Sequence, residues 1–192
     1  GGIFTPAGAV FLSGVMAQYA MEQQLSEITD YLKQIDQKLD DLIQDQKDKT
    51  FSELFAFRHA VDEAALIRES TGKVSSVTWS KVANIGQETA RIQKYALQKL
   101  ENLEKDIHKA KLASSLDEST KKASREIQTW LLVLGNALYI QDQLAVIEID
   151  RVLEDDPESL ENHKKAIYRA RANRFDEIRE TLGKMNAVLD PS

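Results

Sequence analysis

The three histidines of this sequence are the side chains whose ordinary pKa lies closest to neutral pH, so they mark where acid–base or metal chemistry would first be sought. His59, His108 and His163 lie far apart, and none is at metal-ligand spacing from another. A di-iron helical bundle needs a Glu-x-x-His pair on each of two facing helices. Here Glu104 precedes His108 by four residues, and no second copy exists. The sequence therefore predicts no metal site, and we expect the histidines to be structural or surface residues.

Other catalytic patterns are missing too. The carboxylate pairs Asp40–Asp41 and Asp155–Asp156 lie in acidic stretches, without the apolar surroundings that raise one pKa for acid–base catalysis. The sequence contains no GxxxxGK or GxGxxG phosphate loop, no HExxH zinc motif and no GxSxG nucleophile turn. We therefore expect no catalytic residue, no cofactor-binding residue, no cofactor and no enzymatic activity.

Charge sets a second limit on function. The formal net charge is −6, from 31 acidic and 25 basic side chains, whereas nucleic-acid binders usually carry a basic excess. One local basic run could form a face for an anionic ligand, and it comprises Lys164, Lys165, Arg169, Arg171 and Arg174. Alternatively, these side chains pair with the acidic block at 150–161 or with neighbouring helices. The interleaved aromatics Tyr168 and Phe175 are expected to point inward.

Turn-forming residues are too scarce for most folds. Proline occurs only at positions 6, 157 and 191, and all 192 residues include eight glycines and no cysteine. An all-β or α/β domain needs many more turn residues. We therefore expect an all-α protein, an elongated antiparallel helical bundle or coiled coil of about five helices joined by short turns.

The first long helix that could position a site is a heptad helix predicted at about 21–49. Apolar residues alternate there at spacings of three and four, which is the pattern of helices that supercoil around a partner. This heptad seam is the predicted interaction surface, and its residues are Met21, Leu25, Ile28, Leu32, Ile35, Leu39 and Leu42. Its partner is either a neighbouring helix or a second copy of the chain.

The first 21 residues carry no charged side chain. They lack the basic leader of a signal peptide, and their apolar part is shorter than the roughly 20 residues of a membrane span. We interpret them as a helix start buried against protein; the alternative is a membrane-active or close-packing segment. The residues that would form it are Phe4, Ala9, Phe11, Leu12, Ser13 and Ala17.

Further helices are predicted at 51–70, 76–112, 118–153 and 157–189. Thr50 has the spacing of an N-cap, Gly72 that of a left-handed C-cap, and Asp156 that of a cap before Pro157. The segment WLLVLGNALYI at 130–140 is apolar on nearly every side, which indicates the central helix of the bundle.

The run AMEQQLSEITDYL (20–32), preceded by PAGAVFLSGVMAQ (6–18), resembles a family of uncharacterised actinobacterial proteins in which a small-residue segment leads into a glutamine-containing heptad helix. The resemblance covers about residues 4–107. It implies a helical domain within a longer polypeptide and carries over no functional residue. A looser likeness to helical pore-forming toxins concerns architecture alone.

Together these patterns predict a single helical domain over 1–192, a fragment of a longer protein since the chain begins with Gly1. We expect a non-enzymatic protein-interaction, scaffold or oligomerisation module. A membrane-active or lipid-binding bundle is the alternative. The expected partner is another protein or a second copy of the chain, and membrane binding is the alternative. The charge balance disfavours nucleic acid, and the sequence shows no sign of a small-molecule ligand. The cytoplasm is favoured, with secretion or membrane association left open.

Overall fold

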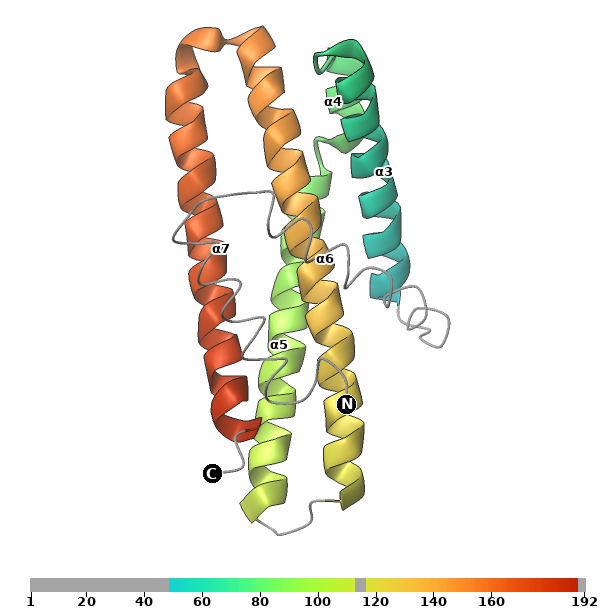
Figure 1. Ribbon diagram of the computed structural model, residues 1–192, viewed down its shortest axis with the longest axis vertical. Helices are drawn as coiled ribbons and strands as arrows, with labels where there is room; N and C mark the ends of the chain where they lie inside the picture. Colours follow the sequence, from blue (N-terminus) through green and yellow to red (C-terminus); the bar gives the residue numbers. More distant parts are fainter. Residues whose placement is uncertain (1–48, 113–116, 190–192) are drawn as a thin grey trace.

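The computed structural model describes residues 49–112 and 117–189 (Figure 1). Within these ranges every regular element is a helix, so the predicted all-α class is confirmed. The heptad seam and the uncharged N-terminal segment lie outside the described residues.

Three long helices form the main body: α5 (Ile85–Leu112), α6 (Asp117–Asp155) and α7 (Leu160–Leu189). They lie side by side, and each runs opposite to the one before it (Figure 1). At 39 residues, α6 is about 58 Å long. The pair α3 (Lys49–Thr71) and α4 (Ser76–Val82) packs against α6 on the side away from α7.

The core is continuous through all of these helices. Its largest fully buried side chains come mainly from α6, where every residue from 129 to 142 is buried. The apolar run at 130–140 is therefore enclosed by α3, α5 and α7, as predicted from its lack of a polar face. The buried side chains outside α6 that lie deepest include Phe51, Leu54, Leu100 and Phe175.

The ends of the helices differ in part from the predictions. Gly72 has a φ of +76°, and its N–H donates to the Arg68 carbonyl at 2.8 Å, so the predicted left-handed cap is confirmed. Thr50 is already inside α3, so it does not cap that helix. The helix expected over 76–112 is divided by a turn at Ala83 and Asn84.

The boundary before α7 also differs. Asp156 makes no side-chain capping bond; its backbone carbonyl instead accepts from the Ser159 N–H at 3.1 Å. Pro157–Ser159 form a short 3-10 turn, η1, and α7 begins only at Leu160. The predicted cap is therefore wrong, although proline does begin the helical segment because its φ is already fixed near helical values.

Candidate functional site

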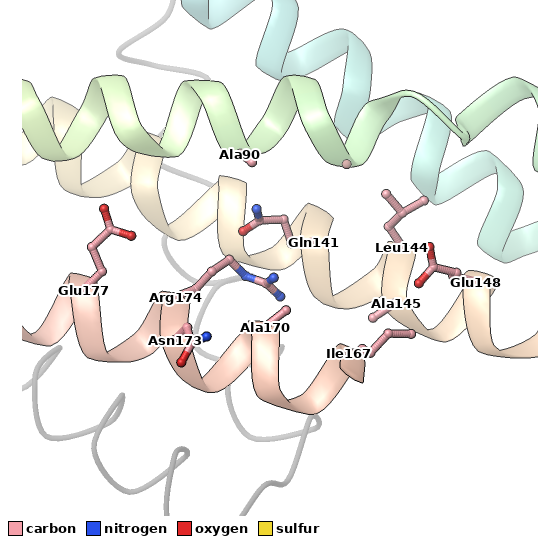
Figure 2. Close-up of a pocket in the computed structure, with 11 residues that line it drawn as sticks. Ala90, Gln141, Leu144, Ala145, Glu148, Ile167, Ala170, Asn173, Arg174 and Glu177 are labelled. Carbon is pink, nitrogen blue, oxygen red and sulfur yellow. The ribbon is translucent and has the colours of Figure 1, made fainter. Parts of the chain in front are cut away.

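A cavity of about 480 Å³ lies between α5, α6 and α7 (Figure 2). Small residues face it from all three helices, namely Gly86 and Ala90 of α5, Ala145 of α6 and Ala170 of α7. These side chains are too short to fill the space between the helices, so the sequence itself leaves the hollow. The remaining lining residues are Gln141, Leu144, Glu148, Ile167, Asn173, Arg174 and Glu177.

A buried ion pair joins α6 to α7 next to this cavity. Arg171 donates from Nε to Asp142 Oδ1 at 2.7 Å and from a terminal nitrogen to Oδ2 at 3.0 Å. Asp142 is 5% exposed and Arg171 is 6% exposed. Burial raises the pKa of Asp142 to about 7 and lowers that of Arg171 to about 9, because both ionised forms lose water. The two hydrogen bonds between Arg171 and Asp142 replace that lost hydration and so stabilise the buried ion pair.

Arg174 adds a second guanidinium one turn further along α7. Its Nε is buried and has no hydrogen-bond partner among the described residues. Burial lowers the pKa of Arg174, while the negative charge of Asp142 opposes that change. Its positive charge also contributes to lowering the pKa of Arg171. Two guanidinium groups thus share the neighbourhood of one carboxylate.

Gln141 brings a buried amide to the same cavity. It is 7% exposed, and its Oε1 has no hydrogen-bond partner among the described residues. Figure 2 shows the Arg174 guanidinium extending between Gln141 and Ala170. A buried polar atom without a partner costs free energy, so both side chains are suited to receive a polar group that enters the cavity.

The five basic residues predicted as an anionic-ligand face do not share one face of α7. Arg171 is buried against Asp142, and Arg174 lines the cavity. Lys164 lies 3.6 Å from Glu161 of its own helix, whereas Lys165 and Arg169 are exposed. All five basic residues lie on α7, but the sequence did not distinguish Arg171 and Arg174, which point into the bundle, from the outward-facing residues.

The neighbouring aromatics divide in the same way. Phe175 is buried, as expected, and the Arg171 guanidinium lies 5.1 Å from the centre of its ring. Tyr168 is 43% exposed, so the prediction that it points inward is wrong. The two residues are seven positions apart on α7, and only the later one is covered.

The histidines occupy separate places. His59 and His108 are exposed, and His163 is partly buried with Nε2 3.2 Å from Glu148 Oε2. No group of three metal-ligating side chains occurs among the residues that the structure describes.

A second set of polar contacts, which the sequence did not reveal, holds α3 to α6. The Tyr139 hydroxyl donates to Asp62 at 2.7 Å, and the Arg58 guanidinium lies 4.4 Å from the centre of the Tyr139 ring. Arg58 also donates to the Asn136 side chain, and Arg68 pairs with Asp150. These contacts lie outside the cavity and serve to position α3.

Comparison with known proteins gives no match: no family model, no curated protein and no solved structure is similar to this chain.

Proposed function

We propose that this chain is a non-enzymatic helical module that acts through protein contacts, by self-association along the heptad seam defined above. The supporting observation is that α3 to α7 already bury their apolar faces against one another. The sequence carries a further apolar stripe, from Met21 to Leu42. Burying one such leucine or isoleucine stabilises a protein by about 1.5–3 kcal/mol, so packing of the seven-residue stripe against another protein surface is favourable.

Heptad spacing indicates that the packing partner of this stripe is a second helix. Leu25, Leu32 and Leu39 fall at one core position of the heptad, and Ile28, Ile35 and Leu42 fall at the other. The opposite face is rich in aspartate and lysine, which suits water. The complete chain would then be an elongated antiparallel bundle with a coiled coil at its N-terminal end.

The cavity supports the non-enzymatic part of this proposal. Its described lining contains no serine, threonine, tyrosine or histidine, and the chain has no cysteine. The lining acids Glu148 and Glu177 are contributed by different helices and lie at opposite ends of the cavity (Figure 2). A cytoplasmic location would suit such a module.

The test compares Ile35→Asp with Gln37→Asp. Both substitutions add one negative charge, but Ile35 lies in the seam and Gln37 lies at the outermost heptad position. By light scattering after size exclusion, we expect the wild type and Gln37→Asp to associate and Ile35→Asp to be monomeric, with equal helical circular dichroism. A monomeric wild type, an associated Ile35→Asp variant or an unfolded one would each contradict self-association through the seam.

A membrane-active bundle is the second candidate, and one observation favours it. Among the described residues one helical stretch, Arg125–Asp155, is long and apolar enough to cross a membrane. In the bundle 83% of its apolar window is buried, as in the core helix of a folded domain. Release of such a helix, together with the uncharged N-terminal segment, is what this candidate requires.

Flotation with anionic and neutral liposomes decides between the two candidates. Membrane activity predicts flotation of the intact chain and its loss when residues 1–17 are removed. Failure of the intact chain to float with either lipid would overturn it.

A further inference from the structure

Around Asp142, where α6 meets α7, two guanidinium groups lie near one carboxylate. Asp142 offers two carboxylate oxygens, and Arg171 binds both of them. Arg174 is partly buried nearby, its Nε has no hydrogen-bond partner among the described residues, and it forms no ion pair within 4.0 Å among them. A buried guanidinium N–H without an acceptor costs free energy, so the site favours a group that accepts a hydrogen bond from a cation, such as an anion.

The nearest acid on the same helix does not supply this anion. Glu177 is one turn beyond Arg174, but its carboxylate points toward a different end of the cavity from the guanidinium (Figure 2). Glu148 lies at the opposite end and is 3.2 Å from His163. The middle of the cavity therefore combines Arg174 with the amide of Gln141.

These two side chains can bind one carboxylate together. Arg174 has an unused N–H in the buried part of its side chain. Gln141 is 7% exposed, and its amide oxygen has no hydrogen-bond partner among the described residues. Rotation of that amide exchanges its oxygen and its NH₂ group, so it can donate to an anion without moving the helix. Two donors would then converge on the same group.

One wall of the cavity is apolar. Leu144, Ala145 and Ile167 form the wall between the Arg174 region and Glu148 (Figure 2). The volume of 480 Å³ falls within the range of about 300–1,000 Å³ that small-molecule sites occupy. A hydrocarbon chain fits this wall, and the glutamates at the two ends disfavour any ligand with several negative charges.

We propose that this cavity binds a monocarboxylate with a medium-length hydrocarbon chain, its carboxylate at Arg174 and Gln141 and its chain along Leu144, Ala145 and Ile167. This ligand site is independent of the heptad seam, so it can be tested whether or not the chain self-associates.

Calorimetric titration with octanoate is the direct test. Octylamine is the matched control ligand, because it has the same number of carbon atoms as octanoate but a cationic head group. We expect octanoate to bind at one site per chain and octylamine not to bind. No heat of binding with octanoate at concentrations up to about 1 mM would overturn the proposal.

Two substitutions on α7 separate a specific head-group contact from general charge attraction. Arg174→Gln and Arg169→Gln each remove one positive charge, but Arg169 is exposed. We expect Arg174→Gln to weaken octanoate binding by about tenfold or more, since it removes a charge-assisted hydrogen bond, and Arg169→Gln to change it by less than about twofold. Equal effects of both substitutions would show nonspecific attraction and overturn the site.

A third variant tests the hydrocarbon part. Ala145→Phe places a ring in the apolar half of the cavity and leaves Arg174 in place. We expect it to abolish octanoate binding while the thermal unfolding transition stays cooperative. Unchanged binding by this variant would place the ligand elsewhere and contradict the proposal.

Discussion

Arg171 of α7 holds both carboxylate oxygens of Asp142 of α6, at 2.7 and 3.0 Å, in the interior of the bundle. The two residues are 29 positions apart in the sequence, and each is more than 90% buried. The contact fixes how α7 lies along α6, because a guanidinium can engage both oxygens of a carboxylate only in one plane.

Removal of one partner of this pair should be severe. We expect Asp142→Ala to lower the free energy of unfolding by about 3–5 kcal/mol, since it leaves Arg171 buried with its charge uncompensated. Urea unfolding measures the change. The control is Arg91→Gln, which breaks an exposed ion pair with Glu88 and should cost less than about 1 kcal/mol. Equal costs for the two variants would contradict the structural role assigned to the buried pair.

Tyr139 should make stability fall at alkaline pH. Burial, with the hydrogen bond to Asp62, raises the pKa of Tyr139 from 10.0 to about 12. The folded state thus holds this proton more tightly than the unfolded state, so the stabilisation is complete below pH 10 and is lost as the pH rises through about 12. We expect the wild type to lose about 1–2 kcal/mol more than Tyr139→Phe over this window, allowing for partial solvent screening. Urea unfolding of both proteins from pH 9 to 12 measures it, and parallel curves would refute the assignment.

Two glycines should respond to alanine with opposite signs. Gly72 has a φ of +76°, so Gly72→Ala should destabilise the protein by about 1–2 kcal/mol. Gly183 lies inside α7, and an added Cβ there meets no atom within 4 Å. Gly183→Ala should therefore stabilise the protein by about 0.5–1 kcal/mol, through higher helix propensity. Thermal melts followed by circular dichroism give both signs, and a shared sign would be inconsistent with this account.

The central position of α6 predicts a steep difference between its buried and exposed leucines. Leu134 is fully buried, so Leu134→Ala should cost about 2–5 kcal/mol by leaving a cavity. Leu153 is 49% exposed near the end of the same helix, and Leu153→Ala should cost less than about 1 kcal/mol. Chemical unfolding of the two variants provides the comparison. Similar losses would mean that the helix is not enclosed as described.

Local sequence signals accounted for the helices better than for the site. The run at 130–140 predicted an enclosed helix because an absent polar face is visible in the sequence itself. Gly72 was likewise predictable, since a glycine after a helical pattern is a local signal. The turn at Ala83 and Asn84 was not, because neither residue breaks a helix strongly.

The ionic cluster depends on which helices are neighbours, and one sequence does not contain that information. Asp142 lies just after the apolar run at 130–140 and has no local sign of a partner, and Arg171 was predicted only as one member of a basic face. The apolar run and the basic run could be combined only once α6 and α7 were known to be in contact. The cavity was equally hidden, because it arises from small residues on three separate helices.

The enclosure of α6 also has a consequence for the order in which the chain is synthesised. α3, α4 and α5 leave the ribosome before α6, yet the surface that covers both α3 and α5 belongs mainly to α6. A nascent chain that ends before Asp117 therefore presents these two apolar helix faces to the solvent or to chaperones. We therefore expect cooperative folding of the described helices to begin only when the segment up to about Asp155 has emerged, and a chain truncated before that point to be a target for proteolysis rather than a smaller bundle.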